Sequence, residues 1–116
     1  MDALTLELLG DCTMSGFTSL WVDDTRPIPS DCGSEWCSAR TAWEALLKLE
    51  LIPFDVVSLD HDLASMVGNK ELTGYDILVW LVSRKLDGLQ VPSVVRVHSA
   101  NPVGVDRMRK TIEKYW

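Results

Sequence analysis

Short hydrophobic runs alternate with longer amphipathic segments along most of this 116-residue chain. Residues 19–22, 56–59 and 93–97 are rich in aliphatic and β-branched side chains, as in strands buried on both faces of a parallel sheet. Residues 36–39 can form a further strand or lead directly into the segment that follows. The pattern therefore predicts three short strands and, on one of these two readings, a fourth.

Three longer segments have apolar residues at the spacing of amphipathic helices. The predicted helices cover residues 42–51, 74–86 and 104–115. Thr41 and Thr73 precede the first two helices as capping residues, and Gly88 follows the second, where a glycine commonly ends a helix. Residues 64–72 contain glycine, asparagine and charged residues, and they are predicted to be a mobile loop.

Strands that alternate with helices predict an α/β sandwich built on a parallel sheet. A chain of this length forms one domain with one core, to which Trp21, Trp43 and Trp80 are expected to contribute. Residues 19–116 are assigned to this domain. Residues 1–18 are predicted to be an N-terminal extension, whose leucine-rich part is either an edge strand or a short helix.

Polar groups follow each of the three predicted strands. They are Asp23 and Asp24 after the first strand, Asp60, His61 and Asp62 after the second, and His98, Ser99 and Asn101 after the third. The carboxyl ends of parallel strands meet at one edge of a sheet, and ligands bind there in α/β folds. The sequence therefore predicts one functional site at this edge.

The carboxylates of Asp23, Asp24 and Asp60 form the oxygen-rich kind of site that Mg²⁺ or Mn²⁺ prefers. Three such groups held close together repel one another and raise pKa values, which a divalent cation relieves. The alternative is that some of them only cap loops or pair with Arg26. Asp62 can contact the metal, orient a neighbouring imidazole or cap its loop, and the sequence does not separate these three roles.

The two histidines, His61 and His98, are candidates for general acid and base together with Asp60, although the sequence does not assign which is which. Ser99 and Asn101 are candidate phosphate ligands, because they precede a helix whose N-terminus can bind an anion. An Asn-Pro turn with a capping residue is the alternative there. Arg26 is a candidate phosphate clamp, and the basic side chains of the last helix are read as solvated.

Several motifs carry a resemblance to known domains. The segments LWVDD at 20–24, FDVVSLD at 54–60 and TGYD at 73–76 resemble the first strand, phosphoacceptor strand and following turn of response-regulator receiver domains. There is no room for the first receiver helix before Trp36, and a last strand with its lysine does not follow Pro102. The set DDxRPxP, SLDHDL, TGYD and VHSANP is instead similar to the degenerate relatives described as cyclic-phosphate-processing receiver domains.

The resemblance implies a reduced, flavodoxin-like three-layer sandwich with a short, mainly parallel sheet. It also implies action on cyclic phosphate ends. The predicted function is therefore a metal-dependent phosphoesterase acting on a cyclic phosphate of a nucleotide, an RNA end or a nucleotide-derived metabolite. One alternative is a non-catalytic module that binds a nucleotide or a protein partner, or that accepts a phosphoryl group on Asp60. An HD-type phosphohydrolase is suggested by His61-Asp62, but the doublet ends a strand and the additional histidine ligands are lacking.

The composition of the chain restricts the classes of binding partner and the cellular compartment that are expected. A net charge of -6 argues against binding duplex DNA through a basic surface, while a metal still allows a small phosphorylated nucleotide or an RNA end. Cys12, Cys32 and Cys37 match no zinc spacing, and reduced thiols in a cytoplasmic protein are expected. No run is long enough to span a membrane. The sequence does not define the oligomeric state or a pathway such as RNA repair or phage defence.

Overall fold

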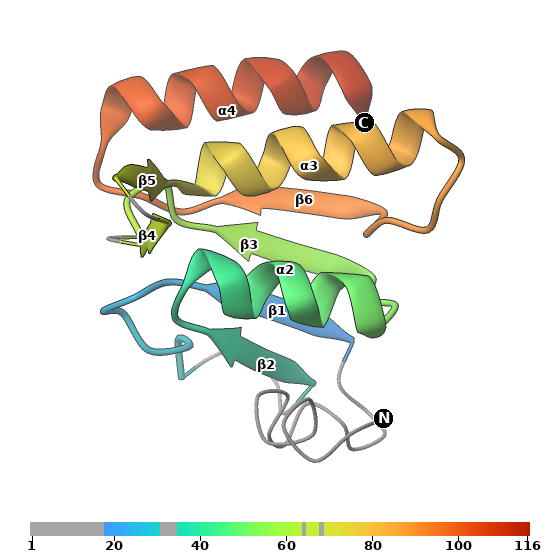
Figure 1. Cartoon of the computed structure of the whole chain (residues 1–116). Coiled ribbons are helices and arrows are strands. Elements are labelled where there is room, and N and C mark those ends of the chain that lie inside the picture. Colours follow the sequence, from blue (N-terminus) through green and yellow to red (C-terminus); the bar gives the residue numbers. More distant parts are fainter. Residues whose placement is uncertain (1–17, 31–34, 64, 68) are drawn as a thin grey trace.

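The computed structural model describes residues 18–30, 35–63, 65–67 and 69–116, and its centre is a four-stranded parallel sheet (Figure 1). The strand order is β2-β1-β3-β6. The strands are β1 (Ser19–Val22), β2 (Trp36–Ala39), β3 (Val56–Leu59) and β6 (Val94–Val97). The α/β class and the short parallel sheet are confirmed, as is the reading of residues 36–39 as a strand.

The four strands are paired without stagger. The last residues of β1, β2, β3 and β6 are aligned as Val22↔Ala39, Val22↔Leu59 and Leu59↔Val97. All four strands therefore end at one level, and the residues that follow them lie along the same edge of the sheet.

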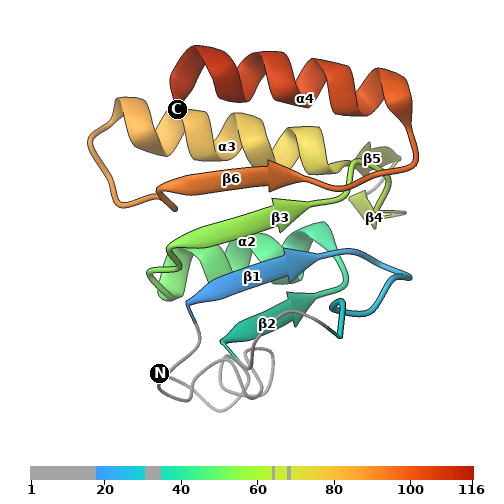
Figure 2. The same cartoon turned by 180° about the vertical axis from the view of Figure 1, so that it is seen from behind.

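Three helices complete the domain, namely α2 (Ala42–Leu51), α3 (Gly74–Leu86) and α4 (Pro102–Tyr115). Helices α2 and α3 cover the same face of the sheet, in front of the strands in Figure 1 and behind them in Figure 2, and α4 lies beside α3. In the described part of the chain, no helix covers the opposite face. Pro27 and Pro29 account for this difference from the three-layer arrangement, because they do not fit a helix interior in the β1–β2 connection.

Each helix begins at a predicted signal. The side chain of Thr41 accepts a hydrogen bond from a backbone N–H of α2, and Thr73 forms a reciprocal capping box with Asp76 in α3. Asn101 caps α4, which begins at Pro102 and therefore two residues earlier than expected, because proline is well tolerated at the first helical position. Gly88, just past α3, has a φ of 76°.

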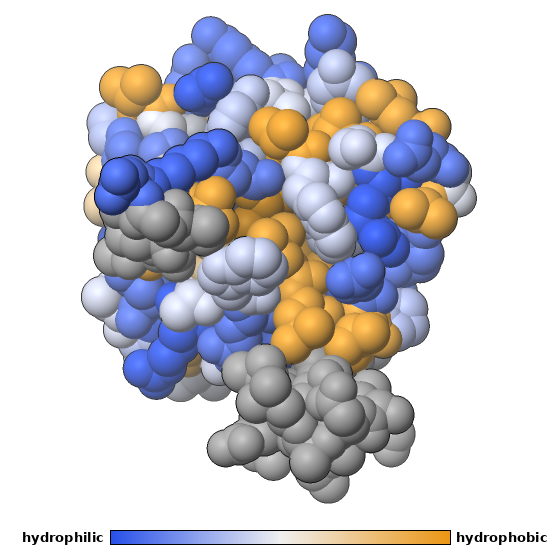
Figure 3. Space-filling model, viewed as in Figure 1, coloured by the Kyte–Doolittle hydropathy of each residue, from blue (hydrophilic) through white to orange (hydrophobic). Residues whose placement is uncertain are grey.

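The core lies between the sheet and the helices. Its strand residues are Leu20, Val22, Cys37, Ala39, Val57, Leu59 and Val95, and its helix residues include Ala45, Leu49, Ile77, Leu78, Leu81 and Met108. Trp21 is buried and Trp80 packs against the core, but Trp43 was wrongly expected to be a core residue, since 61% of it is exposed. It lies on the outer side of α2 and lines a cleft of about 820 Å³ with Leu46, Leu47 and Trp80; Figure 3 shows hydrophobic residues gathered on this face.

Two further expectations need correction. Residues 64–72 were expected to be a loop, but β4 (Ser65–Val67) and β5 (Lys70–Leu72) form an antiparallel pair. The Gly68-Asn69 sequence between them suits a tight hairpin. Cys37 was expected to be reduced, but it is disulfide-bonded. Pairing depends on the distance between cysteines in the fold, which their spacing in the sequence does not reveal.

Several sequence-based expectations concern parts of the chain that the structure does not describe. They include the strand or helix in the N-terminal extension and the reduced state expected for Cys12 and Cys32. Among the described residues, no helix is both long and apolar enough to cross a membrane.

Candidate metal and proton-transfer site

Hydrogen bonds of the sheet continue one residue beyond the strands and position the first polar residue after each. The backbone N–H of Asp60 donates to Val22 O at 2.9 Å, and that of His98 donates to Leu59 O at 3.0 Å. Asp23 is held in the same way by Ala39 O at 3.0 Å. The sheet thus places Asp23, Asp60 and His98 side by side at its carboxyl edge.

Three carboxylates converge there. Asp23, Asp24 and Asp60 each offer one oxygen atom, and these atoms all lie within 4.8 Å of one another. Asp23 and Asp60 are buried, and Asp24 is partly exposed. The predicted convergence of these three residues is confirmed, whereas Asp62 is not part of the group.

Asp23 is held rigidly. Its Oδ1 accepts hydrogen bonds from the backbone N–H groups of Thr25 at 2.9 Å and Arg26 at 2.8 Å, and its Oδ2 lies 3.1 Å from Nε2 of His98. Burial alone would raise the pKa of Asp23, but these hydrogen bonds together outweigh it, and the pKa is lowered. Asp23 is therefore an ionised group with a fixed orientation.

Asp60 is shifted in the opposite direction. Burial raises its pKa, and the negative charge of Asp23 raises it further. Hydrogen bonds from the Ser99 hydroxyl and the backbone N–H of Asp62 only partly compensate. A divalent cation between the carboxylates would stabilise the ionised form of both, and oxygen donors of this kind suit Mg²⁺ or Mn²⁺. The donor set therefore fits the predicted metal.

His98 is enclosed by protein groups on three sides. Its Nδ1 lies 2.7 Å from Oγ of Ser58, and its ring stacks on Trp21 with the centroids 3.6 Å apart and an interplanar angle of 6°. Burial lowers the pKa of His98, although Asp23 and Asp60 oppose this shift, so the ring is neutral near pH 7. Because an ionised carboxylate only accepts, Nε2–H donates to Asp23 and Nδ1 accepts from the Ser58 hydroxyl.

Ser58 and Trp21 were not identified as site residues from the sequence. Both face away from α2 and α3, on the sheet face that also carries His98, since Trp21 pairs with Ser58 and Ser58 with Arg96 in register. The signal that could have revealed Ser58 is a hydroxyl inside an otherwise aliphatic strand, VVSL.

His61 belongs to a second polar group at the same edge. Its Nδ1 lies 2.7 Å from Oδ1 of Asp62, and the hydrogen bond from His61 lowers the pKa of that carboxyl. The Asn101 amide approaches both side chains, at 3.5 Å from His61 and 3.4 Å from Asp62. Of the three roles open for Asp62, the structure therefore shows it orienting His61. Within the described ranges, no group hydrogen-bonds to Nε2 of His61, and 17% of the side chain is exposed.

Two glycines allow helices α3 and α4 to approach this edge closely. A Cβ at Gly74 would overlap the backbone carbonyl oxygen of Asp60, and the Gly74 N–H donates to His61 O at 2.8 Å. A Cβ at Gly104 would lie 2.5 Å from Cγ of His61. The ring of His61 is thus confined between the first turn of α4 and Asp62.

The candidate phosphate ligands have different surroundings. Asn101 is a helix cap, because its Oδ1 accepts from Gly104 N at 3.0 Å, as the alternative reading proposed. Ser99 Oγ accepts from Asn101 N at 3.2 Å and bonds to Asp60. The exposed Arg26 side chain forms no ion pair with the residues that the structure describes, but its charge contributes to the lowered pKa of His98.

Residues 18–114 match the family described as the cyclic-phosphate processing receiver domain. The chain belongs to this family. No curated protein and no solved structure matches the chain. The residues that match this cyclic-phosphate processing receiver domain include the four-stranded parallel sheet, the acidic cluster and both histidines.

Proposed function

We propose that this receiver-like domain is a metal-dependent phosphoesterase that hydrolyses a cyclic phosphate of a nucleotide, an RNA end or a nucleotide-derived metabolite. The observation that carries the proposal is the close placement of two groups. One is the carboxylate cluster, which is suited to a divalent cation. The other is His61, which follows Asp60 in the sequence and is oriented by Asp62. Among the described residues, Nε2 of His61 has no hydrogen-bond partner.

The cluster supplies the electrostatic part of the proposed chemistry. Asp23, Asp24 and Asp60 would hold Mg²⁺ or Mn²⁺, which supplies Lewis-acid stabilisation of the phosphoryl oxygens when bound. His98 acts as a positioning residue, because both of its ring nitrogens are engaged by Ser58 and Asp23. Of the two histidines predicted as general acid and base, only His61 therefore keeps a proton-transfer role in this proposal.

His61 supplies the proton transfer. Asp62 holds the proton on Nδ1, so the lone pair of Nε2 can accept a proton from the attacking water. The water oxygen forms a bond to phosphorus and one ring P–O bond breaks on the opposite side. The leaving sugar oxygen takes a proton from solvent water, and the proton on Nε2 returns to solvent. The exposed Arg26, whose charge acts on His98, would bind a non-bridging phosphate oxygen.

A second candidate is transfer of a phosphoryl group to Asp60. Its position at the end of β3, beside Asp23 and Asp24, supports this reading. The two functions differ in the fate of phosphate, which is released with a ring-opened product in the first case and retained on the protein in the second.

The test is Mg²⁺- or Mn²⁺-dependent turnover of a panel of cyclic phosphates, with acetyl phosphate as the phosphorylation control. His61→Gln is expected to lose about 10²- to 10⁴-fold in rate while keeping metal affinity. Asp60→Asn is expected to lose both turnover and metal binding. Asp55→Asn is the matched control, because Asp55 is an exposed carboxylate before the opposite end of β3. Stable phosphorylation of Asp60 without turnover of any cyclic phosphate would replace the phosphoesterase by the phosphoacceptor.

A further inference from the structure

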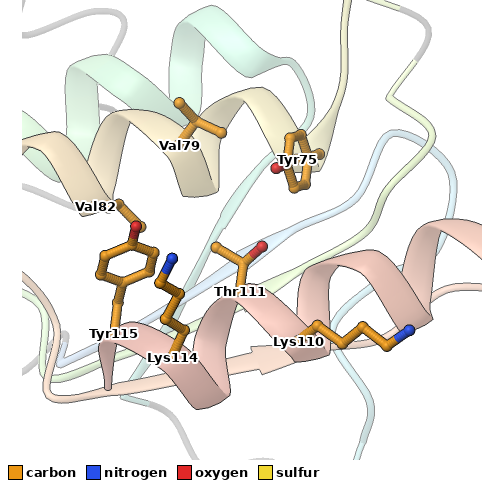
Figure 4. A pocket seen from close by; sticks show the side chains of 7 residues that line it. All are labelled: Tyr75, Val79, Val82, Lys110, Thr111, Lys114 and Tyr115. Carbon is orange, nitrogen blue, oxygen red and sulfur yellow. The ribbon is translucent and has the colours of Figure 1, made fainter.

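A cleft of about 380 Å³ runs between α3 and α4 (Figure 4). Tyr75, Val79 and Val82 line it from α3, and Lys110, Thr111, Lys114 and Tyr115 line it from α4. The cleft thus combines two phenol rings with two ammonium groups, which is an unusual lining for a domain whose net charge is -6.

Positive charge is concentrated along this side of α4. Arg107, Lys110 and Lys114 are spaced by three and four residues and share one helical face. The Arg107 guanidinium lies 3.9 Å from the centroid of the Tyr75 ring, and Lys114 Nζ lies 5.3 Å from that of Tyr115. The pair of Lys110 with Asp106 is largely exposed, so a phosphate can compete for Lys110 at little cost.

The helices that form the cleft start at the functional site. Gly74 contacts Asp60 and Gly104 contacts His61, so the first turns of α3 and α4 border the proton-transfer group. Tyr75 follows Gly74 directly, and Arg107 lies about one turn after Gly104. Both helices then run away from the carboxyl edge of the sheet side by side (Figure 1).

We propose that the α3–α4 cleft binds the nucleotides adjacent to the cyclic phosphate, so that the substrate is the end of an oligoribonucleotide and not a free cyclic mononucleotide. This inference rests on the phosphoesterase function proposed above. Aromatic rings on which bases stack, combined with cations along the backbone, are the means by which proteins bind single-stranded nucleic acid. Arg107 and Lys114 lie about 10 Å apart along α4, which exceeds the reach of a single phosphate contact.

The experiment compares kcat/KM for a 2′,3′-cyclic mononucleotide with that for a short RNA ending in the same cyclic phosphate. The wild-type protein is expected to prefer the RNA. Arg107→Gln and Lys114→Gln are expected to reduce the ratio of the two values. Arg109→Gln is the matched control, because it removes the same charge from α4 but at a position beside Arg96 and β6, outside the cleft.

Two additional measurements distinguish the contribution of charge to RNA binding from that of base stacking. Each lost phosphate contact is expected to reduce the salt dependence of RNA binding, d log K/d log[salt], by about 0.7. Tyr75→Leu is expected to weaken RNA binding by about five- to hundredfold, whereas Tyr75→Phe keeps the ring and most of the affinity. Fluorescence anisotropy with a 3′-phosphate RNA measures both effects without turnover.

The outcomes separate this inference from the function on which it rests. Equal kcat/KM for RNA and mononucleotide, with Arg107→Gln behaving like Arg109→Gln, would overturn the inference and leave the phosphoesterase intact. Absence of all turnover would remove the phosphoesterase. The anisotropy measurement would then decide whether the cleft binds RNA, and equal affinities in all variants would overturn that as well.

Discussion

Replacing Gly104 by alanine is expected to impair the site while leaving the fold intact. The added methyl group would lie 2.5 Å from Cγ and 2.6 Å from Cδ2 of His61, whereas ordinary van der Waals contacts are 3.4–4 Å. The imidazole or the first turn of α4 must therefore move by about 1 Å. A displacement of that size can reduce the rate about 10²-fold when it affects a catalytic group.

The effect of Gly104→Ala on stability should be small because two contributions oppose each other. Alanine favours a helix over glycine by roughly 1 kcal/mol, whereas overpacking a site costs roughly 1–3 kcal/mol. His61 is partly exposed and can move outwards. The free energy of unfolding is therefore expected to change by no more than about 1–2 kcal/mol.

Three measurements test this reasoning on Gly104→Ala, with Val103→Ala as the control because Val103 is 78% exposed in the same turn. They are kcat/KM for cyclic-phosphate hydrolysis, the midpoint of urea unfolding, and the ¹⁵N chemical shifts of the His61 ring. Reduced turnover with shifted ring signals and near-normal stability is expected. If the variant keeps both its turnover and its His61 signals, the ring is not confined as described.

Three other predictions concern the supports of the site. Ser58→Ala should reduce the unfolding free energy in a urea titration by about 1–3 kcal/mol, because Nδ1 of His98 loses its buried partner. Gly74→Ala should destabilise by at least about 2 kcal/mol in the same titration, since its methyl group meets the backbone of Asp60, which cannot rotate away. The metal-free protein should become less stable as pH falls from 7 through about 6.5 towards the lowered pKa of His98, because the His98 imidazole binds a proton more readily in the unfolded chain. Urea unfolding at a series of pH values should show a shallower loss of stability in His98→Gln. An equal loss in that variant would exclude His98 as the cause.

The position of the site could be predicted from the sequence because it depends on where parallel strands end and not on individual side-chain contacts. Apolar runs that end in Asp23, Asp60 and His98 must bring those residues to one edge once the strands are parallel, and the unstaggered register does so. The starts of α2 and α3 were readable for a similar reason, since their caps, Thr41 and Thr73, act within four residues of themselves.

The roles within the site were less readable because they depend on which side chains face each other across the sheet. That Ser58 and Trp21 enclose His98 follows from strand pairing, and the sequence of one strand does not contain it. Asp62 had three possible roles because the sequence does not show whether its side chain faces His61 or the carboxylate cluster. Trp43 shows that core residues are subject to the same limit. A residue on the apolar face of a helix is buried only if a neighbouring element covers it, and Trp43 is largely exposed.

The order of the strands in the sheet also affects how the site forms during folding. The strands that carry it are paired from Ser19 to Val56 and from Val56 to Val94, so every contact between its parts closes a long loop of chain. Contacts of this kind form late and slowly in folding. The acidic cluster is complete once β1 and β3 are paired, whereas the stacking of His98 on Trp21 requires β6 as well. Pairing of β1 with β3 therefore suffices to assemble the acidic cluster, whereas the environment of Trp21 also reports the docking of β6.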